Sequence, residues 1–440
     1  MGVSLTRTAG TPTSKKKFTF SVWYKKTTVR DYGASTSDGF FFNSASSNDN
    51  RLGLYINQEN SPYDQVRLVG RNSASQILDL RTNAILRDPS AWYHIVAKVD
   101  TTQSTNTDRA KLYINGIEQT LDTSSYPNQD VDLEIQHTPY LLSYSGSGNY
   151  LEGLITHYHY TDGYAYDAST FGSTDSTTGE WTINVSPSVT YGTNGFFMFK
   201  DNASVTDQSG NSNNFTLSGT LTPTQDNPSN NFCTWNSVKK LTVTLSNGNT
   251  TTSGNGDNGV WGTIGDNQGK WYWETQENVN NCMVGIASED VAQSTGRSDQ
   301  TGVYGVQNGT TYAYYRNNGS SGQSSGFPQV TTSNTVCHAL DLDNGKYYVG
   351  IDGVFKSLSG TTSDISAGSN ATFTGLDTTK FWFPFTESRG NSAGCDANFG
   401  NGYFGTTAIS SAGTNASNFG SFEYDVPAGF TAWCTKGLNE

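Results

Sequence analysis

The chain has 440 residues, of which 15% are charged and 12% are aromatic, and its formal net charge is −13. This length predicts two or three domains with cores of their own. The acidity and the low content of Lys and Arg exclude a nucleic-acid surface, because that binding depends on dense basic side chains. No apolar run is long enough to span a bilayer and no long segment has a helical period, so we expect an all-β fold without membrane insertion.

Residues 1–17 are polar and end in a run of three lysines. We predict an arm that lies outside the core and anchors the protein to a partner, because polar termini fray unless they dock. The segment lacks the charged, apolar and cleavage regions of a secretion signal, which predicts synthesis in a cytosol.

Short strands separated by turns begin at residue 18. Residues 18–24 alternate in polarity, and so do residues 92–100, whose even-numbered side chains we expect on one face of a sheet and odd-numbered ones on the other. Residues 111–118 contain an Asn-Gly pair, a strong hairpin signal. Residues 151–160 form another strand, followed by a turn or short helix at 167–172. Repeated short strands of this kind predict a β-sandwich.

The second half has the same character after a break rich in Asn, Asp and Pro, which disrupts regular structure. Strands are predicted at residues 270–275, 283–287 and 304–306, and the pairs Asn344-Gly345 and Asp352-Gly353 close successive hairpins of a meander. We therefore predict an arm at 1–17, a first sandwich at 18–225, a linker at 226–240 and a second sandwich at 241–436.

Two sets of phrases resemble known families. The phrases FTFSVW, WYHIVAKVD, KLYING and LITHYHYTDG, with the YGTNGFFMFKD and DQSGNSNNF tail, resemble the laminin G-like, concanavalin A-like jelly roll of structural proteins from tailed phages and other aquatic viruses. The series GKWYWE, VGIA, YGVQNG, ALDLDNGKYYVGIDGVF, FPF and ANFG is similar to the SPRY domain, a bent β-sandwich used for protein recognition. The resemblance implies an all-β chain of two antiparallel β-sandwiches in series, a lectin-like jelly roll and then a SPRY-like domain.

Catalytic patterns are weak in this sequence. A glycoside hydrolase needs two carboxylates across a sugar cleft, and the E-x-D-x-x-E strand of the glucanases is absent. Asp132 with Glu134 and Asp341 with Asp343 put acids on one face of a strand, but each pair lies beside a turn, where acidic side chains are ordinarily solvated. No Ser-His-Asp or phosphate-loop pattern occurs. We predict that the protein is not an enzyme, and a secreted polysaccharide-degrading enzyme is the least supported alternative.

Sugar binding would use aromatic faces flanked by polar side chains, because the apolar face of a sugar stacks while its hydroxyls need polar partners. Several tyrosines lie in or near polar loops, and packing inside the sandwich or a subunit interface is the alternative role for their rings. The candidates are Tyr126, Tyr140, Tyr144, Tyr150, Tyr312, Tyr314 and Tyr315.

Calcium is the metal that best matches the polar loop after residue 200, since it takes oxygen ligands from loop carboxylates and carbonyls. The alternative is that the same side chains form Asx turns, and no cofactor is otherwise expected. The candidate ligands are Asp201, Asp207, Asn211 and Asn213.

His157 and His159 are two apart on a predicted strand, with Asp162 just beyond, so a metal pair is one hypothesis. Two half-buried histidines hydrogen-bonded within the sheet are the favoured alternative.

Five cysteines lie at wide spacings, without the C-x-x-C pairs of a zinc site. An odd number without a secretion signal predicts free, buried thiols at strand positions, with a single disulfide as the alternative. They are Cys233, Cys282, Cys337, Cys395 and Cys434.

Together these features predict a non-enzymatic virion surface protein, a tail- or capsid-associated appendage that recognises a host-surface glycan or protein. The alternative is a capsid decoration or cement protein that serves assembly. Other virion proteins would hold it through residues 1–17, and it would be made in the host cytoplasm and released by lysis. A homo-oligomer is expected, with a trimer favoured, because surface appendages usually have closed cyclic symmetry.

Overall fold

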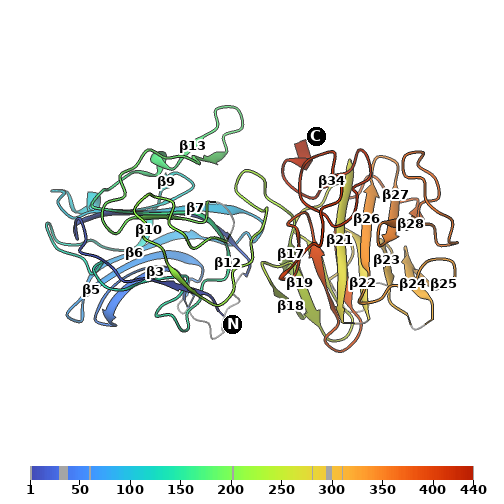
Figure 1. Ribbon diagram of the computed structural model, residues 1–440, viewed down its shortest axis with the longest axis horizontal. Coiled ribbons are helices and arrows are strands. Elements are labelled where there is room, and N and C mark those ends of the chain that lie inside the picture. The colour runs from blue at the N-terminus through green and yellow to red at the C-terminus, as the bar shows by residue number, and fades with distance from the viewer. Residues whose placement is uncertain are drawn as a thin grey trace. The chain divides into compact units, whose positions relative to one another are not determined.

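The computed structural model describes residues 2–28, 38–58, 61–200, 203–279, 281–293, 300–309 and 311–439. The chain divides into two compact units, Met1–Pro223 and Thr224–Glu440, called here the first and second domains. Both consist of strands with short 3-10 helices (Figure 1), and the strand pairings are antiparallel apart from one short parallel pairing in the second domain. The predicted all-β fold is confirmed.

No helix in the described ranges has the length and apolar character needed to span a lipid bilayer.

Two antiparallel sheets make the first domain, and a small hairpin is added to them. In sheet order, the described residues of the larger sheet form β10 (Leu121–Ser125), β6 (Ser75–Ile85), β5 (Gln65–Asn72), β4 (Asn50–Asn57), β3 (Gly39–Ser47), β11 (Pro139–Leu141), β1 (Ser4–Thr6) and β16 (Thr216–Ser218). Those of the smaller sheet form β15 (Phe196–Met198), β12 (Gly153–Asp162), β2 (Lys17–Lys26), β7 (Trp92–Asp100), β8 (Ala110–Ile114) and β9 (Ile117–Glu118). The hairpin is β13 (Gly172–Thr174) with β14 (Trp181–Ile183), and the short helices are η1 (Asn106–Asp108) and η2 (Ala168–Thr170).

The core of the first domain lies between the two sheets. Phe20 of β2 is buried, with its ring centroid 4.5 Å from Phe42 of β3 and 4.8 Å from Tyr160 of β12. On β7, Ile95 and the next odd-numbered residues enter this core, whereas Val96 packs on the opposite face. The predicted two-sided alternation of residues 92–100 is therefore confirmed. The second face is also covered, by side chains of the excursion between β12 and β15.

The predicted N-terminal arm is wrong. Strand β1 lies inside the larger sheet, paired on one side with β11 and on the other with β16. Leu5 has no exposed surface and belongs to the core. One buried leucine in a polar stretch is enough to hold a three-residue strand once both neighbours are present, but it gives no periodic signal in the sequence.

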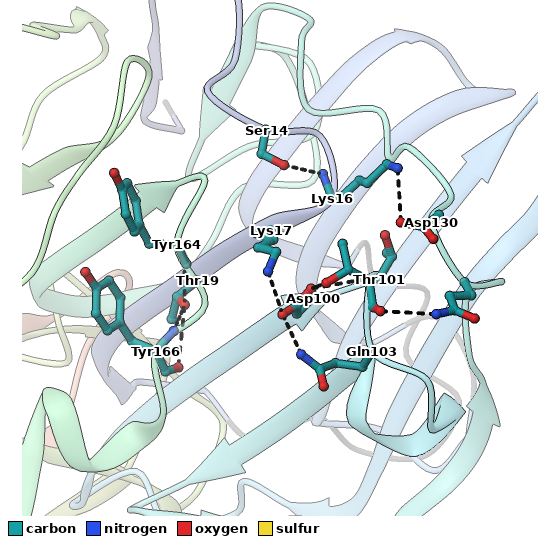
Figure 2. A network of polar contacts seen from close by, with 12 residues as sticks. Ser14, Lys16, Lys17, Thr19, Asp100, Thr101, Gln103, Asp130, Tyr164 and Tyr166 are labelled. Carbon is teal, nitrogen blue, oxygen red and sulfur yellow. Dashed lines mark hydrogen bonds and ion pairs between the residues drawn. The ribbon is translucent and has the colours of Figure 1, made fainter.

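The rest of the segment is fixed by polar contacts. The buried carboxylate of Asp162 accepts hydrogen bonds from the backbone N–H of Thr13, at 2.8 Å, and from that of Asn194, at 2.9 Å. Two of the three lysines form ion pairs with the domain, Lys16 with Asp130 and Lys17 with Asp100, each at 3.2 Å (Figure 2). The basic run therefore belongs to the sandwich rather than to a free anchor.

Two further sheets make the second domain. In sheet order, the strands described in the first are β17 (Trp235–Lys240), β20 (Asn258–Gly262), β30 (Trp382–Ser388), β22 (Cys282–Ser288), β23 (Val303–Gln307), β24 (Ala313–Asn317) and β25 (Ser320–Ser324). Those of the second are β18 (Val243–Ser246), β19 (Thr251–Gly254), β31 (Gly394–Asn398), β21 (Lys270–Val279), β26 (Thr335–Asp341), β27 (Lys346–Ile351) and β28 (Val354–Lys356), with β29 (Phe373–Thr374) and β34 (Thr431–Ala432) at its sides. A hairpin of β32 (Tyr403–Phe404) and β33 (Thr407–Ala408) and the short helix η4 (Gly437–Asn439) complete the described elements.

The predicted linker at 226–240 is wrong as well, because these residues belong to the second domain. Phe232 and Trp235 are buried in it, and β17 pairs with β20. The backbone N–H of Cys233 donates to the carbonyl of Trp433, which ties the start of this domain to its end. The Asn- and Pro-rich stretch forms a tight turn, closed by a pair of hydrogen bonds between Asn227 and Asn230.

The meander and its turns are confirmed. Strands β26, β27 and β28 pair in succession. Asp352 and Gly353 both have positive φ, 50° and 81°, as the mirror-image turns of hairpins require. Asn115 and Gly116 in the first domain have φ of 49° and 77° and close the pairing of β8 with β9 in the same way.

Candidate functional site

A polar hollow lies where four neighbouring strands of the second domain reach the same edge of their sheet. Strands β30, β22, β23 and β24 are adjacent and antiparallel, so the ends of β30 and β23 lie beside the starts of β22 and β24. The hollow has a volume of about 310 Å³. We call it the Tyr314 hollow; its lining residues are Asn281, Gln307, Tyr314, Arg316 and Arg389.

Strand alternation puts these side chains on the face turned away from the domain core. On β24, Ala313 and Tyr315 pack against the core, so Tyr314 and Arg316 point the other way. Gln307 lies opposite Tyr314 in the β23–β24 register. The sheet register therefore brings an aromatic ring, an amide and a guanidinium to one place.

A chain of hydrogen bonds orients the polar groups of the hollow. Arg316 Nη2 donates to Gln307 Oε1 at 3.4 Å, and Gln307 Nε2 donates to Asn281 Oδ1 at 2.8 Å. Because arginine can only donate, it fixes which end of the Gln307 amide faces it, and the orientation of the Asn281 amide follows. Arg316 and Gln307 are each 6% exposed, whereas Asn281 is exposed. The hollow therefore has a buried, hydrogen-bonded base and an exposed rim.

Acidic side chains accompany the arginine at the rim. Arg389 Nη1 is 3.7 Å from Glu387 Oε2, which is fully buried, and Arg389 Nε is 3.8 Å from Asp257 Oδ1. Nearby, the buried Glu277 accepts a hydrogen bond from the backbone N–H of Asn308 at 3.3 Å. Burial raises the pKa of Glu277 to about 7, although the hydrogen bonds of Asn308 oppose this rise.

Of the seven tyrosines predicted to bind sugar, Tyr314 lines the hollow. Tyr312 is 43% exposed and close in sequence, but it does not belong to the lining. Tyr315 packs on the core of the second domain and Tyr126 on that of the first.

The other tyrosines of the first domain are half-buried. Tyr144 has its ring 5.2 Å from Phe40, and its hydroxyl donates to Asn48 Oδ1 at 2.7 Å. Tyr140 lies on β11, and the Tyr150 ring lies directly against the Cα of Gly2. A role in sugar binding stays a prediction for these three tyrosines.

The predicted calcium ligands form a tight turn instead of an open set of oxygens. Asp207 is 8% exposed, and its carboxylate accepts from the backbone N–H of Phe197, Ser209 and Asn213 at 2.8–2.9 Å. Asn211 and Asn213 direct their amide N–H groups to the backbone carbonyl of Gly195.

These contacts match the Asx-turn alternative. Asp201 lies outside the described residues. The described part of the chain contains no cluster of three or more His, Cys, Asp or Glu side chains suited to hold a metal ion. A calcium ion at this loop stays a prediction.

His157 and His159 lie on an irregular part of β12, and their ring centroids are 6.4 Å apart. A β-bulge between Thr156 and His159 breaks the alternation, and His157 has a φ of 47°. His159 is buried, stacks on Phe197 at 4.0 Å and makes a 2.9 Å hydrogen bond through Nδ1 with the Tyr191 hydroxyl. The arrangement matches histidines hydrogen-bonded within the sheet.

The acid pairs considered for catalysis have structural partners. Glu134 Oε2 is 2.6 Å from His137 Nε2. Asp341 accepts from the backbone N–H and the side chain of Asn344, and Asp343 Oδ1 accepts from the backbone N–H of Gly269 at 2.7 Å. Asp341 and Asp343 help to fix the turns beside them, and Glu134 is paired with a histidine.

All five cysteines are buried and unbridged, so the prediction of buried free thiols is confirmed.

Four lining residues of the hollow were not predicted from the sequence. Arg316 follows Tyr314 by two positions, so strand alternation could have placed it on the same face. Gln307 faces Tyr314 across a hairpin and could have been found once that register was fixed. Asn281 lies just before β22 and Arg389 just after β30, both far along the chain from Tyr314, and no local pattern indicates them.

Residues 2–163 match a laminin G-type family of the Concanavalin A-like lectin/glucanases superfamily. This range is a concanavalin A-like domain. The match begins inside the segment that the sequence predicted to be an arm, in agreement with the position of β1 in the sheet. No curated protein matches the chain.

Two solved structures share a likeness with part of the chain. The SPRY domain of human HERC1 is 13% identical, with a TM-score of 0.29 over 37% of this chain and 96% of that one. The TRIM65 PSpry domain is 12% identical, with a TM-score of 0.29 over 38% of this chain and 91% of that one. A likeness at this TM-score carries no argument about function.

Proposed function

We propose that this protein is a non-enzymatic recognition protein of a virus particle surface, which binds host-surface glycan through the Tyr314 hollow. The observation that supports the proposal is the composition of the hollow: one tyrosine ring beside two guanidinium groups and two amides. Sugars are recognised by this combination, because a ring can stack on their apolar face while side-chain polar groups pair with their hydroxyls.

The setting on a particle rests on the resemblance of the sequence to structural proteins of tailed phages. The absence of catalysis is proposed because three of the acids considered as catalytic groups, Glu134, Asp341 and Asp343, are held by a neighbouring histidine or in turns. Residues 2–17 are built into the first domain, so attachment to other virion proteins would use a folded surface instead of a free arm. A homotrimer remains our proposal, and light scattering of the purified protein measures it.

Glycan binding by the full-length protein tests the proposal. We expect a glycan array to give specific ligands, and Tyr314→Ala to lower affinity for them about tenfold, which corresponds to about 1.4 kcal/mol. Tyr312→Ala is the matched control, because it removes an exposed tyrosine from the same loop region without changing the lining.

Equal effects of the two variants would contradict the assignment of the hollow. If no glycan binds while particles lacking the protein lose stability, the capsid decoration alternative is favoured instead. Release of sugar from a host polysaccharide would overturn the non-enzymatic assignment.

A further inference from the structure

The two sheets of the second domain come together at the edge where Cys282 and Cys395 lie. Strand β21 of the second sheet ends at Val279, and β22 of the first sheet begins at Cys282. The chain therefore passes from one sheet to the other within two residues. In the β21–β31 register Gly394 lies opposite Val279, and Cys395 is the next residue along β31. The topology thus brings the two cysteines together from different sheets.

The two sulfur atoms share one neighbour, the hydroxyl of Thr386 on β30. Thr386 Oγ1 is 3.0 Å from Cys282 Sγ and 3.4 Å from Cys395 Sγ. The thiols also contact each other directly, and the hydrogen bond with Cys395 is the largest of the causes that raise the pKa of the Cys282 thiol well above its ordinary value. The backbone N–H of Cys395 donates to Thr252 Oγ1 at 2.9 Å, which fixes its place on the strand. The sulfur atoms therefore lie side by side in the core.

The other three cysteines lie elsewhere in the second domain. Cys337 and Cys434 belong to a separate cluster of buried side chains. Cys233 precedes β17, the edge strand of the first sheet, whereas β22 lies in the middle of that sheet. The direct contact between thiols singles out the pair of Cys282 and Cys395.

We infer that Cys282 and Cys395 form a disulfide that joins the two sheets of the second domain when the reduced protein meets a hydroperoxide. The sulfur atoms have to approach from a hydrogen-bonded contact to about 2.05 Å, which is a short movement within the core. The other three of the five cysteines remain thiols. The inference is independent of glycan binding.

The oxidation takes place in two steps. Cys282 reacts first, because it follows Asn281, which is exposed. Its thiolate attacks one oxygen of hydrogen peroxide and the O–O bond breaks, which gives a sulfenic acid and a hydroxide that takes up the thiol proton as water. The sulfur of Cys395 then attacks the sulfur of Cys282. The S–S bond forms, the S–O bond breaks, and the hydroxyl leaves with the proton of Cys395 as a second water.

Burial makes this reaction slow at neutral pH. Cys282 and Cys395 have no exposed surface, and the raised pKa keeps Cys282 in its thiol form. The thiolate is the reactive form, so oxidation should be at least about tenfold faster at pH 9 than at pH 7.

The disulfide would also fix the rim of the Tyr314 hollow. Asn281 directly precedes Cys282, and Arg389 follows Ser388, which lies opposite Cys282 in the β22–β30 register. A cross-link at Cys282 therefore restricts the opening of the strand ends that carry both rim residues.

Oxidation of the full-length protein tests the inference. The protein is purified with a reductant that is then removed, treated with hydrogen peroxide at pH 7 and 9, unfolded and alkylated. We expect mass spectrometry to show the loss of two hydrogen atoms, three alkylated cysteines instead of five, and tryptic peptides joined through Cys282 and Cys395. Dithiothreitol should restore all five thiols. Hydrogen exchange of β22 and β31 should slow about tenfold in the oxidised protein, because the cross-link restricts the opened chain.

Cysteine variants separate the pair from its neighbours. Cys395→Ser removes the second thiol, so peroxide should leave Cys282 as a sulfenic acid, which dimedone traps. Cys282→Ser should give no cross-link. Cys337→Ser is the matched control, because it replaces a fully buried cysteine on β26 and leaves the pair in place. We expect this control to form the cross-link at the rate of the unmodified protein.

Three results would overturn the inference. The first is a peptide link through any other cysteine. The second is the alkylation of all five cysteines after peroxide treatment at both pH values. The third is a cross-link that forms with loss of protection in β22, because it would arise in unfolded chains and not between the two packed sheets.

Discussion

The two domains contain the same cross-strand pair in different surroundings. In the first domain Trp23 and His94 are neighbours on β2 and β7, with rings stacked at 4.8 Å. In the second Trp273 and His338 are neighbours on β21 and β26, stacked at 4.6 Å. Both histidines are fully buried, and burial lowers the pKa of each to about 3.

In both domains the Nε2 atom of the buried histidine has a hydroxyl group as its partner. His94 Nε2 is 2.8 Å from the Ser21 hydroxyl, and His338 Nε2 is 2.9 Å from the Thr275 hydroxyl. In each case the hydroxyl residue is two positions from the tryptophan on the same strand, so alternation places the pair on one face. A buried neutral histidine can therefore be satisfied by a short strand motif.

The two histidines differ in the partner of their other ring nitrogen, Nδ1. His94 Nδ1 accepts from the indole N–H of Trp181 at 3.0 Å, whereas His338 Nδ1 is 2.6 Å from the Tyr347 hydroxyl. An indole N–H can only donate, so it holds His94 neutral, with its proton on Nε2. A hydroxyl can donate or accept, so Tyr347 could also pair with a protonated His338. The same buried Trp–His motif can therefore exclude protonation of its histidine or permit it, depending on which residue contacts Nδ1.

The largest effect is expected from a deletion in the first domain, and it tests whether the two domains unfold separately. Deleting residues 2–7 removes β1 from between β11 and β16 and opens the core at Leu5. We expect the first domain to lose more than about 4 kcal/mol, because burial of a leucine alone is worth about 2–5 kcal/mol in such series. Hydrogen exchange of the full-length variant should show loss of protection in β2 and β7 and none in β21 and β26. Unchanged protection of β2 would mean that the segment is an arm after all.

Acid should unfold the first domain before the second. Each buried histidine with a lowered pKa binds its proton more readily in the unfolded chain, so stability falls as the pH drops from about 6.5 toward 3. The cost is about 1.4 kcal/mol per pH unit for each histidine, or about 3 kcal/mol by pH 4. In the first domain His159 adds to His94, since burial lowers its pKa well below the usual value.

The second domain has an opposing contribution. Burial raises the pKa of Glu274 and of Glu277 to about 7, so the folded domain keeps protons that the unfolded chain releases above pH 4.5. These groups add stability as the pH falls from 7 to 4.5, against the loss from His338. Hydrogen exchange of the intact protein between pH 7 and 4 shows which domain loses protection first as the pH falls. Glu277→Gln should reduce the difference between the pH values at which the two domains unfold. Loss of protection in β21 at a higher pH than in β7 would contradict the prediction.

The sequence predicted those elements whose signal is local. Residues 92–100 alternate without interruption, and β7 has the same limits as the prediction. The turns at Asn115 and Asp352 carry residue types that tolerate positive φ, so their positions were also predictable. The strand β1 contains one buried leucine, and the stretch before Trp235 mixes turn residues with an aromatic one. Neither segment carries a local pattern that indicates its pairing with distant parts of the chain.

The candidate site could be predicted in part for the same reason. Tyr314 was a candidate because it is an aromatic residue in a polar region. Its partners Asn281 and Arg389 reach it through the pairing of β30, β22, β23 and β24, which is a property of the sheet order. The role of Trp181 against His94 was equally hidden, because it lies in a hairpin far along the chain from β7.

The smallest effect is expected from removing the partner of histidine Nδ1, which is Trp181 for His94 and Tyr347 for His338. Trp181→Phe and Tyr347→Phe each leave a buried histidine nitrogen without its partner, which should cost about 1–3 kcal/mol in the affected domain at pH 7. The two penalties should then change differently with pH. Trp181→Phe also removes the N–H that opposes protonation of His94, so its penalty should shrink at pH 4 by up to about 1 kcal/mol.

Tyr347→Phe removes a hydroxyl that can accept from protonated His338, so its penalty should stay the same or grow at pH 4. Hydrogen-exchange protection of β7 and β26 in the two full-length variants at pH 7 and 4 gives both differences. A penalty that shrinks equally in both domains would show that burial alone sets the response of these histidines to acid. A penalty that shrinks in the first domain alone assigns the difference to the donor-only character of the Trp181 indole.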